Sequence, residues 1–170
     1  MSELSKSDLI LRLVQLRTRV GAHFDDAVQR TPEEFQCRAG CDECCHARFG
    51  VFEIEAEPIR AALAKLDAND PELRATIRSQ ADDPALSDRC ALLVDGRCSV
   101  YAQRPLICRS QGLPLLTEER LDWCPLNFRD RRPPRESILS LVALNAPLSA
   151  LATAWSGDGR RIELAQLARE

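Results

Sequence analysis

Half of the cysteines in this chain stand close together, in a short polar segment. The chain has eight cysteines in 170 residues, and four of them fall within nine residues: Cys37, Cys41, Cys44 and Cys45. Thiolates are soft ligands that favour zinc, copper(I) and iron–sulfur clusters, and the Cys41-x-x-Cys44 spacing lets two thiolates bend around one metal ion. The segment therefore predicts metal or cluster binding. A thiol–disulfide redox site and small apolar structural thiols are the alternatives.

The other four cysteines follow at wider intervals: Cys90, Cys98, Cys108 and Cys124. Four thiolates complete a tetrahedral zinc site or hold a four-iron cluster, so we expect sulfur atoms far apart in sequence to converge on a shared ion or ions. The sequence leaves open whether the eight form one site or two, and whether His46 is a ligand. Adjacent Cys44 and Cys45 point in different directions in most backbone conformations. One of them can therefore bind a second metal, bridge, or remain a free nucleophile.

Composition limits the classes of protein that the chain can belong to. A length of 170 residues suits a single domain over 1–170 that can bury a core without help from a metal. The net charge of −3 gives no electrostatic reason to expect nucleic acid or anionic membrane as a partner. No segment suits a bilayer span, and the N-terminus lacks the apolar core of a signal peptide. We therefore predict a cytoplasmic protein, in which clustered cysteines favour metal over disulfides.

A mainly α fold is expected to position the cysteines, as one small domain of about five helices and one β-hairpin around a cysteine-rich metal centre. Apolar residues that recur every three or four positions predict helices over five segments: 7–29, 55–66, 71–81, 136–155 and 160–169. Ser7 or Asp8 is expected to cap the first helix, and Asp70 with Pro71 to begin the third. Pro147 should kink or split the helix over 136–155.

A β-hairpin is predicted over residues 90–100. Asp95-Gly96 lies there between two apolar runs, and both residues of a two-residue hairpin turn need positive φ. The hairpin would place Cys90 and Cys98 near its ends. A short helical turn should follow over 104–109, whereas the proline-containing stretch 111–135 is predicted to be irregular.

At these residues the sequence resembles the bacterial cysteine-cluster proteins defined by a CxxCxxCC motif (the YkgJ type), which are zinc- or iron-chelating domains. The first half of the pattern matches Cys37–Cys45, and the second half matches Cys90, the run 96–101 and the run 104–109. The resemblance covers roughly 35–126 and implies that the cysteines bind a metal ion, as an iron–sulfur cluster or as Zn²⁺. One departure is that three residues separate Cys37 from Cys41, where the motif has two.

The resemblance also singles out three residues that are not cysteines: Tyr101, Arg104 and Arg109 match the family's Y-x-x-R-P-x-x-C-R run. Arg109, beside Cys108, could donate hydrogen bonds to cluster sulfurs, and Arg104 could do the same or bind an anionic substrate. The alternatives are structural salt bridges for the arginines and a packing role for Tyr101.

Three functions are compatible with this pattern. The first is an iron–sulfur protein with a redox or oxidoreductase role. The second is a structural zinc module for a protein partner. The third is a thiol or methyl-transfer enzyme domain that uses a free cysteine. The chain lacks the paired histidines of hydrolytic zinc enzymes. The sequence leaves open whether it is an enzyme of another kind.

Overall fold

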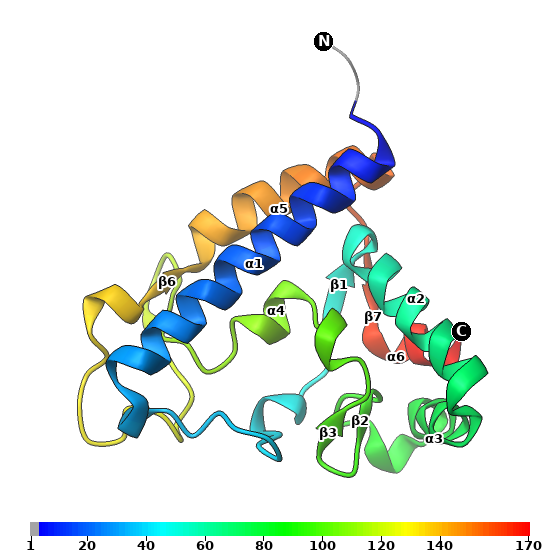
Figure 1. The fold of residues 1–170 in the computed structure, drawn as a ribbon, viewed down its shortest axis with the longest axis horizontal. Coiled ribbons are helices and arrows are strands. Elements are labelled where there is room, and N and C mark those ends of the chain that lie inside the picture. The colour runs from blue at the N-terminus through cyan, green and yellow to red at the C-terminus, as the bar shows by residue number, and fades with distance from the viewer. Residues whose placement is uncertain (1–3) are drawn as a thin grey trace. The chain divides into compact units, whose positions relative to one another are not determined.

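Six α-helices dominate residues 4–170, the part of the chain that the computed structural model describes (Figure 1). They are α1 Lys6–Arg30, α2 Glu53–Asn69, α3 Pro71–Asp82, α4 Leu106–Arg109, α5 Leu141–Ser156 and α6 Leu164–Arg169. Seven strands of two or three residues accompany them: β1 Gly50–Phe52, β2 Leu93–Val94, β3 Arg97–Cys98, β4 Leu115–Leu116, β5 Leu121–Asp122, β6 Leu139–Ser140 and β7 Arg161–Glu163. The predicted mainly α fold class is confirmed.

The chain divides into two compact units. Unit 1 comprises residues 4–38 and 106–159, and unit 2 comprises residues 39–105 and 160–170. Each unit contains helices, short strands and cysteines of its own. The organisation of 1–170 as a single domain stays a prediction.

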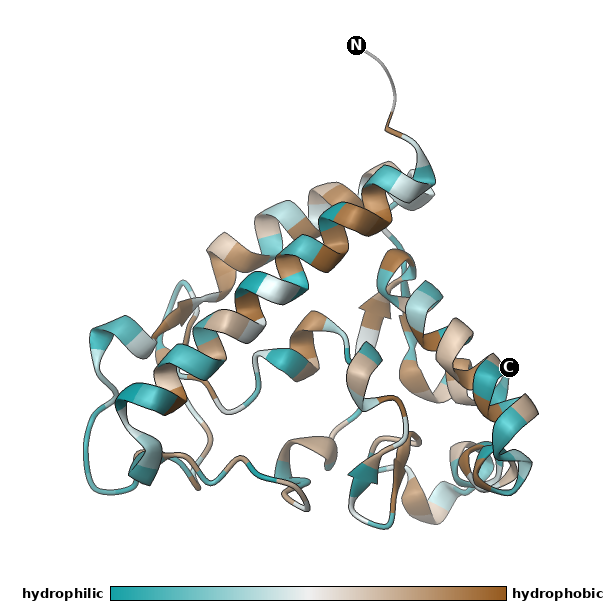
Figure 2. Cartoon of the chain, in the orientation of Figure 1, coloured by the Kyte–Doolittle hydropathy of each residue, from teal (hydrophilic) through white to brown (hydrophobic). Residues whose placement is uncertain are grey.

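Helix α1 of unit 1 is amphipathic, as the alternation of colours along its ribbon in Figure 2 shows. Its buried stripe includes Leu9, Leu13 and Val20, and α5 packs beside it. The helix begins at Lys6, so the prediction of Ser7 or Asp8 as its cap was wrong. Ser5 is the cap: its Oγ accepts from the Asp8 backbone N–H at 3.2 Å, while an Asp8 carboxylate oxygen accepts from the Ser5 N–H at 3.1 Å. This reciprocal capping box satisfies two N–H groups at the helix start.

The second half of unit 1 differs from its prediction in two places. Residues 111–135 are not wholly irregular, because β4 and β5 form an antiparallel pair within them. The helix predicted over 136–155 begins only at Leu141, since Leu139 and Ser140 pair with β4 in parallel and the Ser140 side chain caps the helix. The helix continues through Pro147 without being split.

Unit 2 is built on α2, α3 and α6, which pack against one another. The predicted start of α3 is confirmed: Pro71 is its first residue, and Asp70 accepts from the Leu73 N–H at 3.0 Å. The helix predicted over 160–169 begins only at Leu164. The residues before it form β7, which pairs antiparallel with β1. Side chains alternate along a strand, so Ile162 alone of β7 is buried, and it lies opposite the buried Val51.

The β2–β3 hairpin of unit 2 confirms the prediction made from Asp95-Gly96. Both residues have positive φ, 49° and 70°, and Leu93 lies opposite Cys98 in the antiparallel pair. The Gln80 side chain, on α3, donates to the carbonyls of Ala91 and Leu93 at 3.4 and 3.2 Å. The hairpin is therefore attached to a helix and not only to its own turn.

Candidate metal centre

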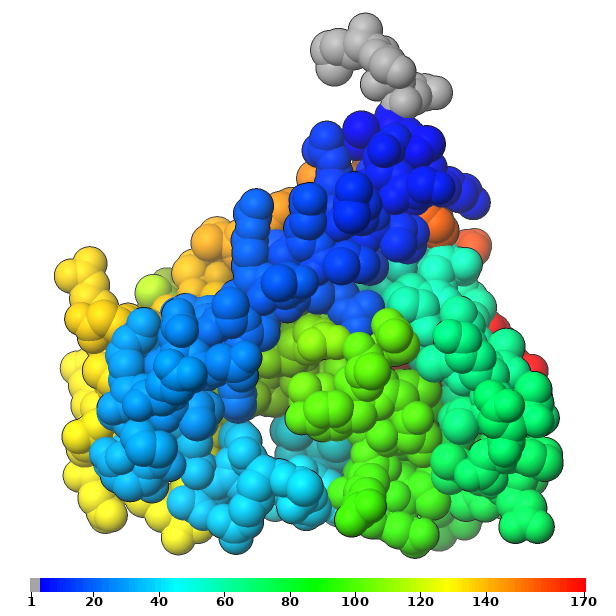
Figure 3. All heavy atoms as spheres, viewed as in Figure 1, coloured from blue at the N-terminus to red at the C-terminus, as the bar shows by residue number. Residues whose placement is uncertain are grey.

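Five cysteines lie in unit 2, and four of them lie on two segments that a backbone hydrogen bond joins. The 3-10 turn Glu43–Cys45 carries Cys44 and Cys45, and the hairpin segment carries Cys90 and Cys98. The Cys90 N–H donates to the Cys45 carbonyl at 2.8 Å, which connects the two segments although 45 positions separate these residues. Both segments reach the face of the molecule shown in Figure 3, the turn in cyan and the hairpin in green.

The thiols of Cys44, Cys45, Cys90 and Cys98 influence one another electrostatically. A hydrogen bond from Cys45 lowers the pKa of Cys44 to about 7, and the same bond, together with burial and nearby Cys90 and Cys98, raises the pKa of Cys45. Burial is the main cause that raises the pKa of Cys90 to about 11 and raises that of Cys98. We call these four residues the unit 2 thiol group.

The structure corrects one expectation within the unit 2 thiol group. The side chains of Cys44 and Cys45 hydrogen-bond to each other, so they do not point apart as adjacent residues usually do. Cys41 is exposed on the loop before the turn. His46 is also exposed, with Nε2 3.6 Å from an oxygen of Asp42.

Arg104 provides positive charge next to the unit 2 thiol group. Its charge lowers the pKa of both Cys44 and Cys98. The guanidinium lies 3.6 Å from the centre of the Tyr101 ring, and Nε donates to the Tyr101 carbonyl at 3.2 Å. Tyr101 is 63% exposed, so it is not a core residue; its ring and carbonyl hold the arginine in place.

The other three cysteines lie in unit 1. Cys37 is exposed, whereas Cys108 in α4 and Cys124 are partly buried; Arg109 is the last residue of α4. The Asn127 amide Nδ2 donates to Cys37 Sγ at 3.4 Å, and the Asn127 backbone N–H donates to the Cys124 carbonyl at 2.9 Å. Sequence reasoning missed Asn127, since a single asparagine in a loop gives no pattern.

Comparison with known families agrees with this concentration of thiols. The family model CxxCxxCC, described as "Putative zinc- or iron-chelating domain", matches residues 36–126 and so includes all eight cysteines. The chain belongs to the CxxCxxCC family. The resemblance inferred from the sequence is therefore confirmed. No curated protein and no solved structure matches the chain. Within residues 4–170 no helix has the length and apolarity needed to cross a membrane.

The donor set of this CxxCxxCC domain fits the zinc or iron of its family by its chemistry. The unit 2 thiol group supplies four soft donors, the number that a tetrahedral zinc ion or an iron–sulfur cluster takes from a protein. In the residues described, no three His, Cys, Asp or Glu side chains already stand in a metal-binding arrangement. Cys44 and Cys45 are instead hydrogen-bonded to each other. Metal binding therefore requires the thiols to lose their protons and turn toward a common point.

The thiols of the metal-free CxxCxxCC domain should react at very different pH values. Cys44, with its pKa lowered to about 7, gains thiolate as the pH rises through 7, whereas Cys90, with a pKa of about 11, stays protonated there. Since the thiolate is the nucleophile, iodoacetamide should label Cys44 first, with a midpoint near pH 7. Residue-specific mass spectrometry across the pH range measures both rates.

Two variants identify the cause of this difference in reactivity. Cys45→Ala removes the hydrogen bond that contributes most to the low pKa of Cys44, so it should move the Cys44 midpoint to higher pH. Arg97→Gln, which removes an exposed arginine of the hairpin, should leave the midpoint unchanged. Equal labelling rates for Cys44 and Cys90 in the metal-free protein would contradict the arrangement described.

Proposed function

We propose that this domain binds an iron–sulfur cluster through Cys44, Cys45, Cys90 and Cys98 and uses it for electron transfer or an oxidoreductase-type reaction. The observation that supports the proposal is the unit 2 thiol group, in which thiols on two segments distant in sequence influence one another electrostatically. Cysteine thiolates hold such clusters without other ligand types. The other four cysteines, Cys37, Cys41, Cys108 and Cys124, remain predicted ligands in addition to this group.

The core of unit 2 supports a reactive centre over a purely structural one. Ile54, Ile59 and Ile77 are completely buried, Leu167 of α6 is buried with them, and the helices that carry these residues pack together. Small domains that depend on a structural metal for folding usually lack such a core. Cys44, by contrast, is exposed, so the centre would be accessible to a protein or small-molecule redox partner.

Arg104 would assist such a centre through its charge. A bound cluster supplies one-electron chemistry, and its potential depends on net charge and on hydrogen bonds to the sulfurs. Arg104 favours the thiolate form of Cys44 and Cys98, and Tyr101 keeps the guanidinium in place by stacking. The positive charge also offsets repulsion among several thiolates. Eight free cysteines fit a reducing compartment such as the cytoplasm, which we include in the proposal.

One observation favours zinc as a second candidate. The hydrogen bond between the Cys44 and Cys45 side chains brings these two thiols close to each other, which suits two thiolates on one ion. A Cys₄ zinc site of this kind would be structural and would present the helices of unit 2 to a protein partner.

Elemental analysis of the full chain decides between the two metals. Protein purified without oxygen should contain iron and acid-labile sulfide in stoichiometric amounts and show broad visible absorbance. Stoichiometric zinc without sulfide would replace the proposal with the second candidate. A chain that contains neither metal, and takes up neither when supplied with it under reducing conditions, would refute both.

A further inference from the structure

The amide of Asn127 is buried and uses its hydrogen-bonding capacity on both sides. The residue is 1% exposed. Its Oδ1 accepts from the Gln36 backbone N–H at 2.8 Å, and its Nδ2 donates to the Gly112 carbonyl at 2.9 Å and to Cys37 Sγ at 3.4 Å. A backbone N–H can only donate and a carbonyl can only accept, so these two partners fix which end of the amide faces the sulfur. The end facing Cys37 must be the N–H donor.

Gly112 forms the other side of the place that the Cys37 sulfur occupies. Its φ is +92°, a conformation that side chains rarely adopt, and a Cβ atom there would lie only 2.5 Å from Cys37 Sγ. The sulfur therefore packs directly on the backbone of Gly112. The Gln36 hydrogen bond fixes the chain immediately before Cys37. These contacts define the position of the sulfur even though Cys37 as a residue is exposed.

We propose that Asn127 is the positioning residue that holds the sulfur of Cys37, one of the predicted ligands, ready to bind the metal. This inference rests on the proposed metal-binding function and adds to it a residue just beyond the matched family segment, which ends at residue 126. The Asn127 N–H donor orients the sulfur without adding charge, and burial strengthens its hydrogen bond. Partners of this kind orient metal ligands, and their loss lowers metal affinity by roughly 10- to 100-fold.

A double-mutant cycle on the full chain tests the inference. The variants are Asn127→Asp, Cys37→Ser and the two combined. Asparagine to aspartate keeps an oxygen for the Gln36 N–H but removes the N–H that faces the sulfur. The readout is Zn²⁺ affinity under reducing conditions, measured by competition with a chromophoric chelator. Each single variant should lose roughly 10-fold or more in affinity, and the double variant should be no weaker than Cys37→Ser, because both act through one sulfur.

Two further variants separate positioning from charge and from loss of fold. Asn127→Ala removes the amide without adding a carboxylate and should weaken binding in the same direction. Asn145→Asp, on the exposed side of α5, should bind Zn²⁺ as the unchanged chain does. Circular dichroism of each metal-free variant should show the same helix content, which establishes that the fold is retained.

Two results would overturn the role of Asn127. One is unchanged affinity in both Asn127 variants. The other is an equal loss for the Asn127 variants with and without Cys37, which a merely structural residue would produce. Unchanged affinity in Cys37→Ser would overturn Cys37 as a ligand while leaving the unit 2 thiol group in place. An unchanged chain that binds no metal would instead refute the proposed function itself, and the inference with it.

Discussion

Serine in place of Cys90 or of Cys98 is expected to remove stoichiometric metal from the protein. Each substitution takes one of four thiolates from the unit 2 thiol group and leaves a hydroxyl, a poor ligand for soft metals. Loss of a direct ligand should exceed the roughly 10- to 100-fold cost of losing an outer partner, so affinity should fall by more than about 100-fold. Iron, sulfide and zinc per chain, together with chelator competition, measure the effect.

Ser99→Ala is the matched control for these substitutions. Ser99 lies in the same hairpin segment and contributes a backbone N–H to the Leu92 carbonyl at 2.9 Å, which alanine retains. The variant should therefore keep its full metal content. Full metal content in both Cys90→Ser and Cys98→Ser would show that the ligands have been assigned to the wrong cysteines.

Local signals in the sequence predicted the parts of the fold that local chemistry determines. The Asp95-Gly96 turn and the start of α3 at Asp70-Pro71 are examples, since positive φ and an N-cap depend on a few adjacent residues. The strands β6 and β7 were mistaken for helix because each is only two or three residues long. Pairing partners distant in sequence decide such short segments, and those partners cannot be recognised from the segment itself.

The candidate site shows the same division between local and long-range information. Residue type and spacing predicted that the cysteines bind metal, and the family match agrees with this. They did not reveal that the Cys45 carbonyl accepts from Cys90, because that bond depends on how two distant loops meet. They also did not reveal Asn127, whose importance comes entirely from its three partners in the folded unit.

Alanine in place of Arg74 is expected to destabilise the protein by roughly 3 kcal/mol. Arg74 is 1% exposed on α3, and its guanidinium donates to the Ala168 carbonyl of α6 at 2.7 Å. Its Nε lies 3.4 Å from an oxygen of Asp67, an ion pair without hydrogen-bond geometry. Alanine would leave the buried carbonyl without its donor, at about 1–3 kcal/mol, and would add a cavity where the long side chain was. Urea unfolding followed by circular dichroism gives the free energy of unfolding.

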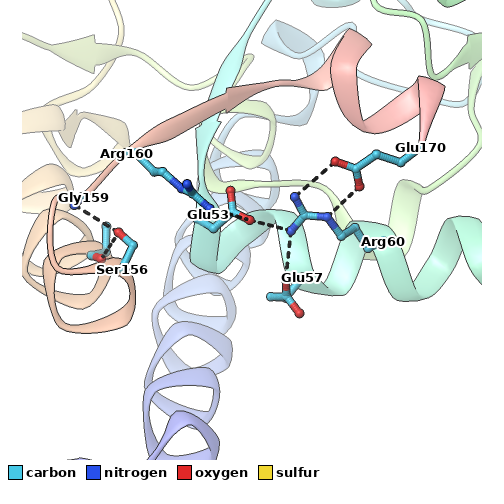
Figure 4. Close-up of polar contacts among 8 residues, drawn as sticks. Glu53, Glu57, Arg60, Ser156, Gly159, Arg160 and Glu170 are labelled. Carbon is cyan, nitrogen blue, oxygen red and sulfur yellow. Dashed lines mark hydrogen bonds and ion pairs between the residues drawn. The ribbon is translucent and has the colours of Figure 1, made fainter.

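Arg78→Ala separates the effect of burial from the effect of charge. Arg78 lies on the same helix and contacts the same Asp67, at 2.9 Å, but its side chain is 41% exposed. Exposed ion pairs contribute at most about 1 kcal/mol, so this variant should lose far less stability than Arg74→Ala. Helix α6 keeps a second link to α2 in both variants, through Arg60 and Glu170 (Figure 4). If both arginine variants lost stability equally, the charge of Arg74, and not its burial against α6, would be what stabilises unit 2.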